Sequence, residues 1–181
     1  MNEGLIPRRY AKAVYEFALD KGKARQMYEL MQRVAASFAA EPSLQEAMSN
    51  PFVPDADKRM LLTTAAGASE GDALFADTLR LLAVNKRLDF ARDIALAYLD
   101  IYRKANHIYR VDITSAAPLS DAEMKRLHDL VERHLKGGKA EFTDKVDPAL
   151  IGGFVIDIDS ERLDASVSNE LKQLRLKLLS K

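Results

Sequence analysis

The sequence of 181 residues contains no cysteine, which excludes disulfide bonds, thiolate metal sites and a cysteine nucleophile. It also carries no net charge, because 27 basic and 27 acidic side chains balance overall and in each half of the chain. Nucleic acids and anionic lipid surfaces attract proteins through an excess of positive charge, so we predict neither as a partner. No stretch approaches the roughly 20 apolar residues of a membrane span, and we expect membrane association only indirectly, through a complex.

Motifs of catalysis and cofactor binding are missing as well. Neither G-x-G-x-x-G nor G-x-x-x-x-G-K-[ST] occurs, and G-x-S-x-G and H-E-x-x-H are absent. The three histidines, His107, His128 and His134, are not spaced to converge on one metal ion or reacting group. The acidic run that starts at Asp157 lacks the glycine and the bidentate glutamate of a calcium loop. We therefore predict no catalytic residue, no metal site and no cofactor.

What the sequence does contain is helical periodicity throughout residues 1–105. Apolar residues recur at helical spacing, and proline and glycine divide the stretch into about six helices with short connections, as in a helical bundle. The fourth predicted helix carries the apolar residues Met60, Leu61, Leu62 and Ala65. The fifth, for which Asp72 is the candidate cap, has a wide apolar arc. Such an arc is either buried on several sides or leaves one strip free for a partner helix.

From Asn106 the period of the apolar pattern changes from about 3.6 to two, which predicts strands. We expect strands around Val111, at 139–146, at 154–159 and at 162–165. A helix capped by Ser120 or Asp121 precedes the second of these strands, and a last helix starts at Ser166 or Ser168. The predicted fold class is mainly α: an N-terminal six-helix bundle (1–105) followed by a small α+β C-terminal domain (106–181).

The third of these strands is the second part of a distinctive stretch, D-P-A-L-I-G-G-F-V-I-D-I-D, at 147–159. Phe154, Ile156 and Ile158 alternate with more polar positions, which predicts one buried face. Gly152 and Gly153 stand at the start of the alternation. Glycine there suits a positive φ or a close approach to another strand, so we interpret the pair as backbone geometry rather than a ligand site.

Five segments, taken in order, resemble the delta subunit family of bacterial ATP synthase, called OSCP in mitochondria. They are R-R-Y-A-K-A-V-Y-E-F-A at 8–18, N-P-F-V-P at 50–54, L-L-A-V-N-K-R-L at 81–88, V-D-I-T-S-A-A-P-L at 111–119, and D-P-A-L-I-G-G-F-V-I through L-D-A-S-V and N-E-L-K-Q-L from 147 onward. The resemblance covers almost the whole chain, and the family's layout of a helical domain followed by a smaller domain matches the one predicted above.

The resemblance implies a non-catalytic connector in the peripheral stalk, on the cytoplasmic face of a bacterial membrane. In the family, the helical domain holds the N-terminal helix of an alpha subunit between its first and fifth helices, and the C-terminal domain meets the b subunits. Carried over by position, the alpha groove would use Tyr10, Ala13, Val14, Phe17, Thr78, Leu81, Leu82 and Asn85. The b contact would use Gly152, Gly153, Phe154, Leu171, Leu174 and Leu178.

Two further interpretations of the residues stay open. A helical domain could be an RNA-binding module or another adaptor, and steep salt dependence of binding would indicate phosphate contacts. A hydrolase or transferase could use Asp144, Asp147 or Asp157, although aspartates beside a turn more often cap it. Under the connector interpretation, we expect Tyr10→Ala to weaken alpha binding by more than about 1 kcal/mol if Tyr10 is an anchor.

Overall fold

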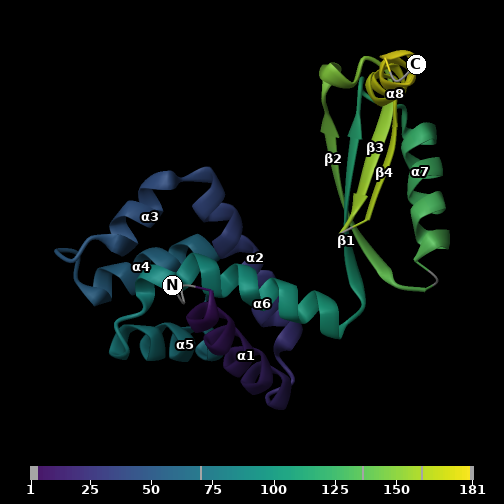
Figure 1. Ribbon diagram of the computed structural model, residues 1–181. Helices are drawn as coiled ribbons and strands as arrows, with labels where there is room; N and C mark the ends of the chain where they lie inside the picture. The colour runs from purple at the N-terminus through teal and green to yellow at the C-terminus, as the bar shows by residue number, and fades with distance from the viewer. Residues whose placement is uncertain (1–3, 70, 136, 160, 180–181) are drawn as a thin grey trace. The chain divides into compact units, whose positions relative to one another are not determined.

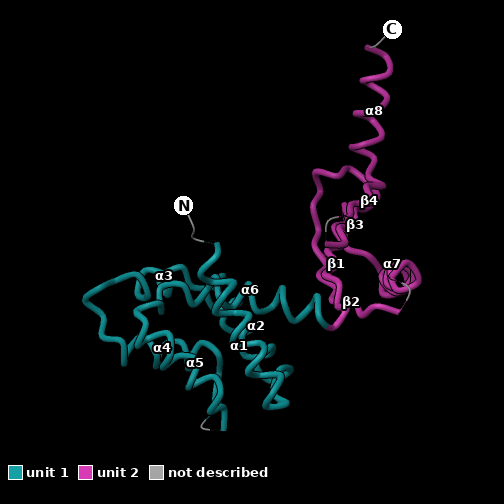
Figure 2. The backbone as a smooth tube through the Cα atoms, turned by 60° about the horizontal axis from the view of Figure 1, so that its bottom comes forward, with its two compact units in different colours: residues 1–105 teal, residues 106–181 magenta. Residues whose placement is uncertain are grey.

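A computed structural model describes residues 4–69, 71–135, 137–159 and 161–179 (Figure 1). The chain divides into two compact units, Met1–Ala105 and Asn106–Lys181, which Figure 2 draws in different colours. Within the described residues the fold is mainly helical, with a small four-stranded sheet confined to the second unit. This confirms the predicted order of a helical part followed by an α+β part.

The first unit consists of helices joined by short connections. Proline and glycine set two of the boundaries: Pro42 opens a helix, where its missing N–H costs nothing, and Gly67 ends one with a left-handed φ of +56°. The elements in chain order are α1 (Leu5–Asp20), α2 (Ala24–Ala40), α3 (Pro42–Ser49), α4 (Asp55–Ala66), α5 (Ala73–Val84), the 3₁₀ turn η1 (Leu88–Phe90) and α6 (Ala91–Ala105).

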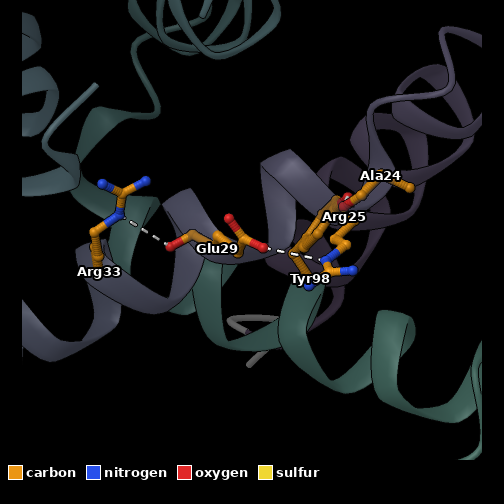
Figure 3. Close-up of polar contacts among 5 residues, drawn as sticks. All are labelled: Ala24, Arg25, Glu29, Arg33 and Tyr98. Carbon is orange, nitrogen blue, oxygen red and sulfur yellow. Dashed lines mark hydrogen bonds and ion pairs between the residues drawn. The ribbon is translucent and has the colours of Figure 1, made fainter. Parts of the chain in front are cut away.

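Helix α6 is the centre of this unit and packs against both α1 and α2. Its residues Ile94 and Tyr98 are almost completely buried, beside Met27 and Val34 of α2. Burial of such side chains is the main source of stability for a helical bundle. The hydroxyl of Tyr98 donates a hydrogen bond to the backbone oxygen of Ala24 at 3.0 Å, which ties α6 to the start of α2 (Figure 3).

Two features of this unit differ from what the sequence pattern indicated. On α4, Met60 and Leu61 are exposed, because the buried stripe runs through Lys58, Leu62 and Ala66 at four-residue spacing. The ammonium of Lys58 reaches the backbone oxygen of Met48 at 2.7 Å, so this buried charge has a hydrogen-bonding partner.

Asp72 stands at the N-cap position of α5, but its side chain does not cap the helix. Its carboxylate instead accepts hydrogen bonds from the backbone N–H and the hydroxyl of Ser69. These bonds, with the Ser69 backbone contact first among them, lower the pKa of Asp72. The acidic side chain therefore stabilises the loop before the helix rather than the helix end.

The second unit is built on a sheet whose strand order is β2-β1-β3-β4. Strands β1 and β2 are parallel and are joined through α7, while β3 is antiparallel to both of its neighbours. Helix α7 lies along one face of the sheet (Figure 1). The elements are β1 (Ile108–Ser115), α7 (Asp121–His134), β2 (Lys139–Val146), the 3₁₀ turn η2 (Pro148–Leu150), β3 (Gly153–Ile158), β4 (Glu161–Ser166) and α8 (Val167–Leu179).

The core of this unit lies between the sheet and α7. Val111 and Ile156 from the sheet meet Val131 of α7, with Phe154 and Ile158 packed at the edges. This confirms the predicted inward face of β3. Val155, on the opposite face, is also buried, so that face of the strand is less open than its alternation predicted.

Ser120 caps α7 as predicted, in a capping box where its hydroxyl accepts from the Glu123 N–H and the Glu123 carboxylate accepts from Ser120.

Candidate functional site

A groove runs between α1 and α5 on the first unit, with a volume of about 560 Å³. Most of its lining is apolar, and several of the apolar side chains are exposed: Phe17 is 45%, Leu81 48% and Val84 77% accessible to solvent. The lining residues are Ala13, Val14, Phe17, Asp77, Thr78, Arg80, Leu81 and Val84.

Five of the eight residues expected at the alpha contact line this groove: Ala13, Val14, Phe17, Thr78 and Leu81. They come together because α1 and α5, which are far apart in sequence, both turn an apolar stripe toward the same opening.

The other three expected residues do not line the groove. Leu82 is only 2% exposed and belongs to the core. Tyr10 is partly buried against the same core, one helical turn before Val14. Asn85 lies just past the end of α5, where its side-chain amide donates to the backbone oxygen of Leu81 at 2.8 Å.

Three lining residues, Asp77, Arg80 and Val84, were not predicted. Asp77 and Val84 stand four residues before and three residues after Leu81, so they share its helix face. That spacing was the signal in the sequence that could have identified Asp77 and Val84. Asp77 and Arg80 form an ion pair at 3.1 Å, with both side chains largely exposed, and this pair gives the apolar groove a charged edge.

On the second unit, the two glycines expected at the b contact lie at the start of β3. There they pack against the end of β4 and the first residue of α8. Gly153 has a φ of +77°, and a Cβ there would lie 2.2 Å from the backbone oxygen of Ala165. A Cβ on Gly152 would lie 2.9 Å from a methyl group of Val167, whose N–H donates to the Gly152 oxygen. This confirms the interpretation of the pair as backbone geometry, and Phe154 beside it is partly buried in the core.

Helix α8 follows β4 in the chain and has no buried residue. Leu171, Leu174 and Leu178, the other residues expected at the b contact, are 52%, 55% and 78% exposed. Figure 2 shows α8 continuing away from the sheet beyond its first turn. An exposed stripe of leucines on a helix is typical of a surface that another protein covers.

The acidic and histidine candidates serve other contacts. Asp147 accepts a hydrogen bond from the Ala149 N–H at 2.9 Å, which confirms its predicted capping role, and Asp157 pairs with Arg162 at 3.5 Å. Asp144 lies 3.8 Å from His128, whose ring stacks on Phe142. Among the described residues, no group of three or more acidic or histidine side chains is placed to hold a metal ion.

An apolar groove between two helices and a separate exposed leucine helix are features typical of proteins that bind other helices. Within the part of the chain that the structure describes, no helix is both long and apolar enough to cross a bilayer.

Comparison with known proteins gives this class a specific family. The sequence profile described as "ATP synthase delta (OSCP) subunit" matches residues 6–178. The ATP synthase subunit delta of Parabacteroides distasonis is 38% identical over 179 residues, covering 99% of this chain and 98% of that protein. The subunit delta of Bacteroides thetaiotaomicron is 34% identical over 182 residues, covering 100% and 97%. The chain belongs to the ATP synthase delta (OSCP) family.

A solved structure agrees at the level of the fold. One chain of the Toxoplasma gondii mitochondrial ATP synthase hexamer superposes with a TM-score of 0.75 at 22% identity, covering 99% of this chain and 98% of that one. Family membership makes this chain a non-catalytic subunit of the ATP synthase peripheral stalk, which associates with other subunits of that membrane-bound complex. It decides against the RNA-binding and hydrolase interpretations that the residues alone left open.

Proposed function

We propose that this chain links the catalytic head of a bacterial ATP synthase to the b subunits, on the cytoplasmic side of the membrane. In this proposal the first unit, a bundle of six helices, binds the N-terminal helix of an alpha subunit, and the second unit binds the b subunits. A stator resists the torque of the rotor, so it needs tight contacts that do not react, and buried apolar area supplies them.

The observation that carries the alpha contact is the groove between α1 and α5. Its exposed Phe17, Leu81 and Val84 form an apolar surface that an amphipathic helix would cover, and Val14 and Thr78, both nearly buried, form its floor. Tyr10 and Asn85 lie one turn beyond Val14 and Leu81, so they extend the same two helix faces.

The b contact is supported by the second unit's exposed helix. Leu171, Leu174 and Leu178 leave a stripe on α8 without cover from the described part of the chain, and Gly152 and Gly153 hold the base of that helix close to the sheet. Phe154 would act from the core, by supporting the strand that carries this junction.

Calorimetric titration of the full chain with a synthetic alpha N-terminal helix tests the groove. We expect binding that changes little between low and high salt, since apolar burial dominates. Leu81→Asn should weaken it at least about tenfold, a loss of about 1.4 kcal/mol. Leu96→Asn on α6 is the matched control, because Leu96 is 47% exposed, Leu81 is 48% exposed, and Leu96 does not line the groove.

Absence of binding by the folded wild-type chain would contradict the alpha contact. Equal affinities for the Leu81 and Leu96 variants would place the contact outside the groove. Tyr10→Ala is a less direct test, because Tyr10 also packs against the core and its loss would disturb the unit itself.

A further inference from the structure

We propose that α8 binds its partner as one strand of a short coiled coil, through a seam of Val167, Leu171, Leu174 and Leu178. The partner is a helix with its own heptad seam and with an acidic residue beside Arg175. This inference rests on the proposed contact between the second unit and the b subunits. It adds the binding face, the packing mode and the charge that the partner must carry.

The spacing of the apolar residues defines the seam. Val167, Leu171, Leu174 and Leu178 are separated by four, three and four residues, which is the alternation of a and d positions in a heptad repeat. All four are exposed, from 38% at Val167 to 78% at Leu178. Leu176, two residues after Leu174, lies about 200° around the helix and therefore outside this seam.

The base of α8 is held firmly, so the seam has a defined direction. The Val167 N–H donates to the Gly152 oxygen at 3.0 Å, and the buried Ser166 hydroxyl accepts from the Asn169 N–H at 3.2 Å. The same hydroxyl donates to the Asp164 carboxylate at 2.6 Å. A helix fixed at its first turn and exposed along the rest loses little further freedom when a partner binds.

The charges beside the seam specify the partner. With Leu171 and Leu178 at a positions, Glu170 and Lys177 fall at g and Arg175 at e, the positions that form ion pairs across a coiled coil. All three side chains are exposed. The partner helix therefore needs acidic residues facing Arg175 and Lys177 and a basic residue facing Glu170. Lys172, at a b position, points away from the seam and does not take part.

A second copy of this chain is a poorer occupant than a longer helix. Helix α8 spans 13 residues, or about two heptads, and helices of that length are only marginally stable in water unless other contacts support them. A longer partner helix can add contacts beyond the seam, which a second α8 cannot.

The test of the seam compares two leucines of similar exposure on the same helix. Full-length wild type, Leu174→Asn and Leu176→Asn are titrated with the water-soluble part of the b subunits from the same synthase. Leu174 and Leu176 are 55% and 61% exposed and neither is buried, so circular dichroism should show both variants folded. We expect at least tenfold weaker binding for Leu174→Asn and wild-type binding for Leu176→Asn.

Equal loss in both variants, or no loss in either, would overturn the seam while leaving the b contact in place. No binding by the wild type would contradict the b contact itself. Light scattering of the free protein should give a monomer; a dimer that Leu174→Asn dissociates would overturn the proposal in favour of a second copy.

The charge requirement has its own matched pair, Arg175→Glu and Lys172→Glu. Both variants make the same change in net charge, but only Arg175 flanks the seam. We expect Arg175→Glu to weaken binding several-fold more than Lys172→Glu at low salt, with the difference shrinking at high salt as screening increases. Equal effects of the two variants would overturn the assigned register.

Discussion

At the scale of single residues, Gly153 shows how one position can fix where a binding helix, α8, begins. Its φ is positive, and a Cβ at this position would lie only 2.2 Å from the Ala165 oxygen, so there is no room for a side chain. Because β3 and β4 come this close at Gly153, Ser166 and Val167 lie beside Gly152, where α8 begins. The glycine therefore acts on binding only indirectly, through the direction in which α8 starts.

Tyr98 illustrates how a buried polar tip constrains a helical core. Its side chain is fully buried beside Tyr15, and its hydroxyl has the Ala24 oxygen as partner. Burial, followed by the effects of Tyr15 and Tyr102, raises the pKa of Tyr98. A phenol whose pKa is raised in the folded state stabilises that state while it is protonated, and this contribution falls as the pH rises above the unfolded value of about 10.

We therefore predict that Tyr98→Phe lowers the free energy of unfolding by about 1 kcal/mol at neutral pH, through loss of one hydrogen bond. The same variant should lose less stability than wild type between about pH 10 and pH 11, because it no longer has this phenol to ionise. Urea unfolding of both proteins at neutral pH measures the loss of the hydrogen bond, and urea unfolding at about pH 10 and pH 11 measures the loss of stability with rising pH. A variant that loses stability as steeply as the wild type would show that Tyr98 does not dominate the alkaline response.

At the scale of elements, α8 depends on the hydrogen bonds of its first turn, since its other residues bury nothing. Ser166 accepts from Asn169 at the start of the helix and donates to Asp164. The Ser166 hydroxyl, and then its backbone N–H, lower the pKa of Asp164. A lowered carboxylate pKa contributes stability above its unfolded value of about 3.9, and this is lost as the pH falls through the folded value.

We predict that Ser166→Ala frays α8 and destabilises its first turn by about 1 kcal/mol, the usual loss for removing an N-cap side chain. Amide exchange at Asn169 should accelerate most. Ser168→Ala is the control, since Ser168 was the alternative cap predicted from the sequence and the capping hydroxyl is that of Ser166. Equal acceleration in the two variants would show that the cap does not hold the helix.

The groove is also a property of elements rather than of single residues. Neither α1 nor α5 is unusual by itself; each has an apolar stripe wider than its own core contact requires. The exposed parts of the two apolar stripes line the same groove, and together they form a surface that can bind a helix.

At the scale of the whole molecule, each unit has its own hydrophobic core. The core of the first unit is formed by α1 to α6 and that of the second by the sheet and α7, and the two clusters share no residue. A unit with its own core can fold without the rest of the chain. The two partner contacts proposed here would then be separable in experiment.

We predict that the fragment 1–105 is folded in isolation, with helical circular dichroism and a cooperative thermal transition. The smaller core of 106–181 predicts a lower stability for that fragment, because small units bury a smaller share of their surface. Comparing the melting curves of both fragments with that of the full chain measures this. An unfolded 1–105 fragment beside a folded full chain would contradict the prediction.

The amino-acid sequence alone determined the change from helices to strands near Asn106, the inward face of β3 and the family to which the chain belongs, and it narrowed the caps of α7 and α8 to two residues each. These features depend on local spacing and on motifs, which the order of residues records directly. Only the tertiary structure decided that Leu82 is core while Leu81 is open, that Lys58 is buried while Met60 is exposed, and that Asp77, Arg80 and Val84 line the groove. The physical reason is that periodicity shows that a helix has an apolar face, whereas which part of that face stays exposed depends on the helices that pack against it.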